Sequence, residues 1–248
     1  MSPSEWKYDA TPGIEKFCTT LWNVVLLEGE AGSPRAAEAL EQLCRTYWYP
    51  LYAYLRRLSY GPQDAQNLTE GFFARLRGKN VGATADRRNG KFRSFLLASL
   101  NHFLAYEKDR VNEARHAGSP MPISIEGRDA ENRYLQDALS DLSPERIFER
   151  RWAIAVLEQA LVRLRAEHAN AGNTRQFTVL RKFLTNNVGD KAYGRVAEEL
   201  NVSAASSAGT VQRMRQRYRE LVRAEIADTV AGTGDIDDET RWLVGALS

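Results

Sequence analysis

Apolar side chains recur every three or four positions along most of this chain, and this spacing predicts an all-α protein. The strongest run predicts a helix from Leu40 to Leu58, which Pro50 is expected to kink or divide. A second helix should begin at Pro62 and end near Gly78, and a third should follow the polar loop 79–90. Ser143 and Pro144 are expected to open a long helix that continues to about His168.

The helical spacing fades between His116 and Pro144, where glycine and proline interrupt a mixed-charge stretch. We interpret this stretch as the boundary between two helical domains. The predicted organisation is an N-terminal extension (1–32), a first domain (33–115), a flexible linker (116–144), a second domain (145–230) and an acidic C-terminal tail (231–248).

Residues 192–219 have the pattern of a helix-turn-helix, with a break at Asn201 and a helix cap at Ser203. At 100° per residue the second helix has one apolar side and one basic side, an arrangement suited to the major groove. Ser207 falls on the side that should be packed, Arg219 is expected at the groove edge, and a plain helical hairpin is the alternative reading. The side chains predicted to contact DNA here are Ser203, Ser206, Thr210, Arg213, Arg215 and Arg217.

The net charge of +2 conceals two basic segments and one acidic segment. Residues 87–115 contain seven Lys/Arg and three Asp/Glu, and residues 213–223 contain five Arg and one Glu. Residues 225–239 contain six acidic residues and no basic one. Two basic segments suit contact with one polyanion at two places, although solvated helix faces are an equal alternative.

Other functional classes have little support in the sequence. The chain contains no phosphate-binding glycine motif and no HExxH, and its two cysteines and three histidines have no ligand spacing, so we expect no catalytic activity, metal or cofactor. No apolar run is long enough to span a membrane, and the start MSPSEWKYDA does not have the pattern of a secretory signal. We therefore expect a cytoplasmic protein.

Two further segments carry a family resemblance. Residues 64–76 read DAQNLTEGFFARL and residues 91–110 read KFRSFLLASLNHFLAYEKDR. Together with the helix-turn-helix, and in the same order, they resemble the extracytoplasmic-function sigma factors of bacteria, which belong to the sigma-seventy family. The resemblance covers roughly 33–223. It implies that the first segment, whose usual form is close to DAEDLTQEFFARL, docks on the clamp of core RNA polymerase.

The residues implied in polymerase binding are Asp64, Asn67 and Glu70. Asn67, Glu70 and Gly71 depart from the usual motif. Without the resemblance, a solvated polar face is the preferred interpretation of this helix side.

The resemblance assigns 91–110 to promoter melting and to reading the downstream promoter element. A melted strand requires basic residues along its backbone and platforms on which its bases stack. The implied contacts are Arg87, Arg88, Lys91, Arg93, Asn101, Lys108 and Arg110, whereas Phe92, Phe95 and Phe103 are expected in the core. The helix-turn-helix corresponds to the family's reader of the minus-thirty-five element, with Asn201 replacing the turn glycine and Ser207 a valine. The interruption at 116–144 corresponds to the family's linker.

The resemblance therefore predicts a transcription initiation factor whose partners are core RNA polymerase and promoter DNA, and it admits an anti-sigma factor as a further partner. A polymerase-independent helix-turn-helix regulator is the alternative. The apolar end 242–247 suggests a terminal helix that either packs back onto the protein or binds a partner.

Overall fold

The computed structural model describes residues 21–28, 33–78, 91–113, 125–137, 141–184, 197, 199 and 203–247. Its regular elements within these residues are helices, which confirms the all-α prediction, and their one extended pairing is an antiparallel bridge between Lys91 and Val230. The helices are α1 (Leu21–Glu28), α2 (Pro34–Arg57), α3 (Pro62–Gly78), α5 (Phe92–Glu113), α6 (Ile125–Asp137), α7 (Pro144–Asn170), α8 (Thr174–Leu180), α10 (Ala204–Ala227) and α11 (Ile236–Leu247).

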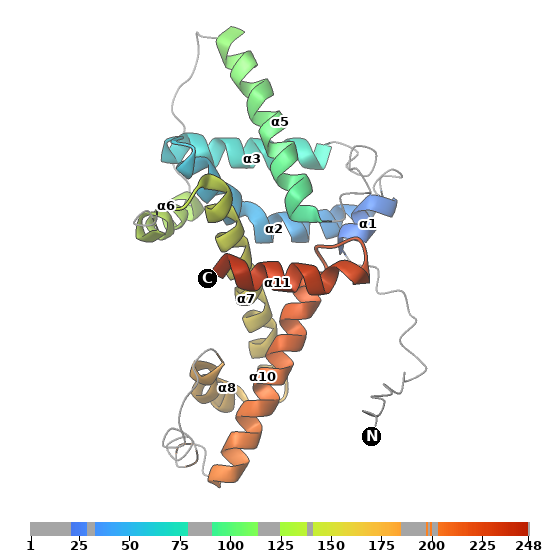
Figure 1. Ribbon diagram of the computed structural model, residues 1–248, viewed down its shortest axis with the longest axis vertical. Helices are drawn as coiled ribbons and strands as arrows, with labels where there is room; N and C mark the ends of the chain where they lie inside the picture. Colours follow the sequence, from blue (N-terminus) through green and yellow to red (C-terminus); the bar gives the residue numbers. More distant parts are fainter. Residues whose placement is uncertain are drawn as a thin grey trace, which may run out of the picture.

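Helix α7 joins the two ends of the molecule (Figure 1). It packs against α2 at one end and against α10 farther along, and α11 lies across it. Helices α3 and α5 lie at the end that contains α2, and α8 lies beside the first half of α10 at the opposite end. The segments that the sequence predicts as two domains are therefore in direct contact through α2 and α7.

Helix α2 continues through Pro50, so of the two predicted effects of this residue, a kink or a division, the division is wrong. Proline removes one backbone hydrogen bond from a helix interior and crowds the preceding turn. The side chains on both sides of Pro50, among them Tyr47 and Leu51, are fully buried. Their burial outweighs the local cost, because burying one large apolar side chain contributes about 1.5–3 kcal/mol.

Two predicted helix starts are confirmed by their capping geometry. Ser143 precedes α7, and its Oγ accepts a hydrogen bond of 3.3 Å from the backbone N–H of Arg146. Ser203 precedes α10, and its Oγ accepts one of 3.1 Å from the N–H of Ser206. Each cap satisfies one backbone donor that the helix leaves unpaired, so these boundaries follow from local chemistry.

Helix α1 lies in the stretch that the sequence assigns to an N-terminal extension. Trp22, Val24 and Val25 are buried, and the Trp22 ring lies 4.9 Å from the Phe92 ring, centroid to centroid. The backbone N–H of Trp22 also donates a hydrogen bond of 3.0 Å to the Asp228 carbonyl. This segment is therefore part of the core, which its short apolar run did not reveal.

Helix α6 occupies part of the predicted flexible linker and packs against α2 and α3. Ala130 and Tyr134, about one turn apart, are buried, and the Arg56 guanidinium lies 4.9 Å from the Tyr134 ring. Glu131 accepts two hydrogen bonds of 2.8 Å from Arg56 and one of 2.6 Å from Tyr52. The sequence did not predict α6 because most of its residues are polar, and the ion pair with α2 that helps to attach it involves a residue distant along the chain.

Replacing Glu131 with glutamine is expected to lower the free energy of unfolding by about 1–3 kcal/mol, because Arg56 would lose a charged partner in a largely buried site. Burial acts to raise the pKa of Glu131, but the Arg56 and Tyr52 hydrogen bonds outweigh it and leave the pKa below its usual range. The stabilisation is thus present at neutral pH and is lost as the pH falls through the lowered pKa. Urea denaturation measures the loss, and Asp129→Asn, at an exposed carboxylate of the same helix, is the control. Equal stability of the two variants would contradict this account.

The buried apolar side chains form one cluster, with members from every helix named above. Within the described part of the chain, no helix is long and apolar enough to cross a membrane. The fold thus places two exposed surfaces, that of α3 with α5 and that of α10, at opposite ends of one core.

Candidate nucleic-acid interface

The first helix of the predicted helix-turn-helix lies almost entirely outside the described residues. Only Ala197 and Glu199 of 192–200 are described, both in helical conformation, and Asn201 is not. The Glu199 carbonyl accepts a hydrogen bond of 2.9 Å from Arg175, next to the start of α8. The second helix, α10, is described along its whole backbone and carries the testable part of the prediction.

The packed side of α10 differs from the predicted side near the start of the helix. Ser207 is fully buried and donates a hydrogen bond of 3.1 Å to the Ser203 carbonyl, whereas Ala208, predicted to be packed, is exposed. Val211 and Met214 are buried as predicted. Ser207 tolerates burial because its hydroxyl is satisfied within the helix.

This packing determines which side chains of α10 face outward. Gln212, Gln216 and Arg219 are exposed and fall within roughly 60° of one another at 100° per residue. Arg213 lies beside them, exposed, and its Nη2 donates 3.1 Å to Thr210 of the same helix. In the described part of the chain, neither Arg213 nor Arg219 has a carboxylate partner. We call Gln212, Arg213, Gln216 and Arg219 the outer face of α10.

Arg217 is not part of this outer face, although the sequence predicts it on the DNA-facing side of the helix with Ser206 and Arg213. Its guanidinium donates hydrogen bonds of 2.9 and 2.7 Å to Glu167 of α7 and one of 2.9 Å to Glu220. These hydrogen bonds lower the pKa of the Glu167 carboxyl and of the Glu220 carboxyl. Arg217 therefore ties α10 to α7 in this structure, and its charge is balanced.

The other α10 side chains predicted to contact DNA form hydrogen bonds within the helix or to the segment packed against it. Thr210 Oγ1 donates 2.8 Å to the Ser206 carbonyl. Arg215 is half-buried, and its Nε donates 2.8 Å to the Phe183 carbonyl. Ser203 and Ser206 are exposed at the start of α10 and form the cap. The structure therefore brings Arg213 to the outer face and places Arg215 at the margin.

The predicted downstream-element residues fall into two sets around α5. Arg93 is 9% exposed, donates a hydrogen bond to Glu239 of α11, and lies 3.8 Å from a Glu149 oxygen of α7. Lys91 Nζ lies 3.1 Å from the other Glu239 oxygen. In this conformation Arg93 is a core residue, which corrects its prediction as an exposed contact.

The second half of α5 is the exposed part. Lys108 is exposed, and exposed Asn101 accepts a hydrogen bond of 3.2 Å from the Tyr54 hydroxyl. Tyr106 is also exposed, and the Arg75 guanidinium lies 4.5 Å from its ring. Such a ring beside a cation is suited to stacking a base, and the sequence interpretation missed it. Arg87, Arg88 and the side chain of Arg110 lie outside the described residues.

The three phenylalanines of α5 are packed, as predicted. Phe92 is fully buried, Phe103 is buried, and Phe95 is half-buried against the core. The Phe92 ring lies 4.9 Å from the Tyr47 ring in an edge-on arrangement. None of the three is exposed for base stacking.

The predicted polymerase-binding residues share an exposed side of α3. Asp64 lies in the first turn, where a negative charge is favourable to the helix dipole. Asn67 accepts a hydrogen bond of 2.9 Å from Gln63, and Glu70 accepts one of 2.8 Å from Gln66. All three are exposed, and their hydrogen bonds run along the same helix, which leaves the carboxylates accessible to a basic partner.

Comparison with protein-family models, with curated proteins and with solved structures found no match to this chain.

Proposed function

We propose that this chain is a transcription initiation factor that binds core RNA polymerase through α3 and promoter DNA through α10 and α5. The observation that carries the proposal is the outer face of α10, where the Arg213 and Arg219 guanidinium groups, which have no carboxylate partner among the described residues, lie exposed beside two amides. Of these amides, Gln216 donates a hydrogen bond of 3.2 Å to Glu220 on the same helix. Glutamine can pair with adenine and arginine with guanine or phosphate in the major groove. The family resemblance of residues 64–76 and 91–110 supplies the polymerase part of the proposal.

The positions of the surfaces support this reading. The outer face of α10 and the exposed half of α5 lie toward opposite ends of the molecule (Figure 1). Two DNA contacts at a set separation select paired sequence elements, because both elements must match at once. The molecule would thus act as a geometric reader and perform no chemistry of its own.

Charge reversal on α3 tests the polymerase contact. Asp64→Lys with Glu70→Lys is expected to weaken co-sedimentation with core RNA polymerase by at least about tenfold, because like charges replace attraction across the interface. Glu38→Lys, at an exposed carboxylate of α2, is the control. If the α3 variant assembles normally with core polymerase, this side of α3 is a solvated surface and not a binding site. Run-off transcription on a random promoter library then tests initiation directly.

One observation favours the polymerase-independent regulator as a second candidate. Helices α2 and α7 share one core, so the two predicted DNA-reading segments are not joined by a free tether here. Such a fixed arrangement would hold the two segments in place without a polymerase to position them. Sequence-specific binding to duplex DNA without polymerase, together with no binding to core polymerase, would favour this second candidate.

A further inference from the structure

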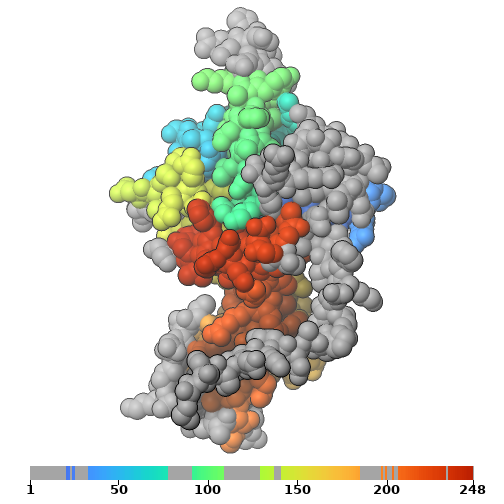
Figure 2. Space-filling model, turned by 45° about the vertical axis from the view of Figure 1, so that its right-hand side comes forward, coloured from blue at the N-terminus to red at the C-terminus, as the bar shows by residue number. Residues whose placement is uncertain are grey.

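The C-terminal helix α11 covers the predicted downstream-element segment at the start of α5. Figure 2 shows α11 lying across the middle of the molecule, against the start of α5 and above α10. Glu239 of α11 is 1% exposed and pairs with Lys91 and Arg93. One carboxylate therefore binds two of the cations that the sequence analysis assigns to DNA.

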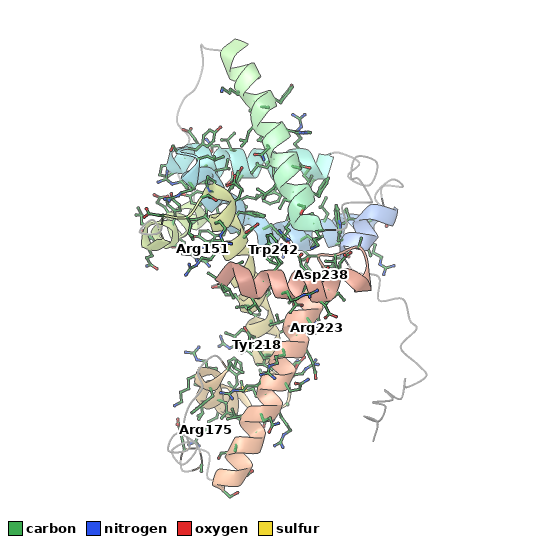
Figure 3. The ribbon with its side chains drawn as sticks, viewed as in Figure 1. Arg151, Arg175, Tyr218, Arg223, Asp238 and Trp242 are labelled. Atoms are coloured by element: carbon green, nitrogen blue, oxygen red, sulfur yellow. The ribbon has the colours of Figure 1, made fainter. Side chains whose placement is uncertain are left out.

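Aromatic rings complete the enclosure of Arg93. Its guanidinium lies 4.5 Å from the Trp242 ring of α11 and 5.5 Å from the buried Trp152 ring of α7. Trp242, which is labelled in Figure 3, is itself 45% exposed. Helix α11 thus supplies the outer wall of this enclosure, and its departure would expose Arg93 and Trp152 together.

The apolar attachment of α11 depends mainly on partly buried side chains. Leu243 is its one buried apolar side chain in the described residues, whereas Trp242 and Val244 are exposed. Ile236, Ala246 and Leu247 are half-buried against the core. A further ion pair of 2.7 Å joins Asp237 to Arg223, and both side chains are largely exposed. With one fully buried apolar side chain, α11 opens at lower free-energy cost than the centre of the core, and DNA phosphates can then form charged hydrogen bonds with Lys91 and Arg93 in place of Glu239.

A short 3-10 helix, Thr233–Asp235, separates α11 from an anchored segment. Thr229 and Val230 are buried, and the Thr229 carbonyl accepts a hydrogen bond of 2.9 Å from the Phe92 N–H, so the chain is anchored up to this point. Gly232 and Gly234 follow, both exposed. Glycine allows a wide range of backbone conformations, so α11 can swing away while the anchor stays in place.

We propose that α11 is a displaceable strap, in which Glu239 holds Lys91 and Arg93 away from nucleic acid in the free protein. DNA phosphates then replace the Glu239 carboxylate as the partners of these two cations, and the released α11 leaves the start of α5 open. The inference rests on the proposed function, since it takes the start of α5 as a DNA-contacting segment.

Hydrogen exchange of the full-length protein, with and without a forked DNA duplex of mixed sequence, tests the strap. On DNA binding, the amides of 236–247 are expected to lose protection by about tenfold or more, while those of 221–230 keep it. Unchanged protection of 236–247 in a protein whose α10 is protected by DNA would overturn the strap and leave the proposed function intact. Absence of DNA binding at low salt would overturn both.

A charge-neutral variant gives an independent readout. Glu239→Gln is expected to bind DNA more tightly and to steepen the dependence of log K on log salt by roughly 1–2, because two further cations reach phosphates. Asp238→Asn is the matched control, since this neighbour pairs only with exposed Arg241 in the described structure. Identical salt slopes for the two variants would overturn the proposal.

Discussion

Truncating Phe148 to alanine is expected to lower the free energy of unfolding by about 3–5 kcal/mol, as is typical when a fully buried phenylalanine is removed. Phe148 lies on α7, and its ring is 6.3 Å from the Tyr47 ring and 6.4 Å from the Tyr54 ring, both on α2. The cavity would therefore open at the contact between the two predicted domains. Calorimetry should show a melting temperature lower by roughly 10 °C.

The shape of the same transition distinguishes one core from two. If α2 and α7 share one core, the whole chain should unfold in a single thermal transition, and Phe148→Ala should lower the temperature of that entire transition. Val162→Ala, at an exposed site on the same helix, should leave the melting temperature almost unchanged. Two transitions, of which Phe148→Ala moves only one, would instead support the two-domain division that the sequence predicts.

Replacing Arg213 and Arg219 together with alanine is expected to weaken duplex DNA binding by about 1–3 kcal/mol for each residue that reads a base. For each residue that contacts a phosphate, the slope of log K against log salt concentration should instead become shallower by about 1. Both guanidinium groups lie on the outer face of α10 and lack a carboxylate partner among the described residues. Fluorescence anisotropy over a salt series separates the two effects.

Arg217→Ala is the matched control on the same helix. Because Glu167 and Glu220 already bind this guanidinium, its loss should change DNA affinity little and cost less than about 1 kcal/mol of stability, as for other exposed ion pairs. If Arg217→Ala weakens DNA binding as much as Arg219→Ala does, the orientation of α10 predicted from the sequence is the better one.

Local features of this protein were predictable from the sequence. The caps at Ser143 and Ser203 and the burial of Phe92 and Phe103 agree with the structure. Caps depend on side chains three residues away, and helical periodicity depends on neighbours within a turn or two. Both can therefore be predicted from short segments of sequence. The same locality explains why the helical class was predicted correctly.

The features that the sequence did not reveal involve partners that are distant along the chain. Arg93 pairs with Glu239, 146 residues later, and Arg217 pairs with Glu167, 50 residues earlier. Neither pairing leaves a signal in local spacing, so the sequence predicted both arginines as DNA contacts and did not reveal the carboxylates that bind them in this structure. Helix α6 was missed for the same reason, since its Glu131 is held by Arg56, 75 residues away.

The sequence by itself determined that this protein is helical, where α3, α5, α7 and α10 begin, and which segments carry excess positive charge. Only the tertiary structure decided which of those charges are exposed, because an ion pair forms wherever the fold brings a carboxylate within reach. It also decided between the two readings of the C-terminal end. Helix α11 packs back onto α7, and Leu243 and Glu239 are buried there. Burial and charge pairing are properties of the folded whole, so periodicity within one segment does not determine them.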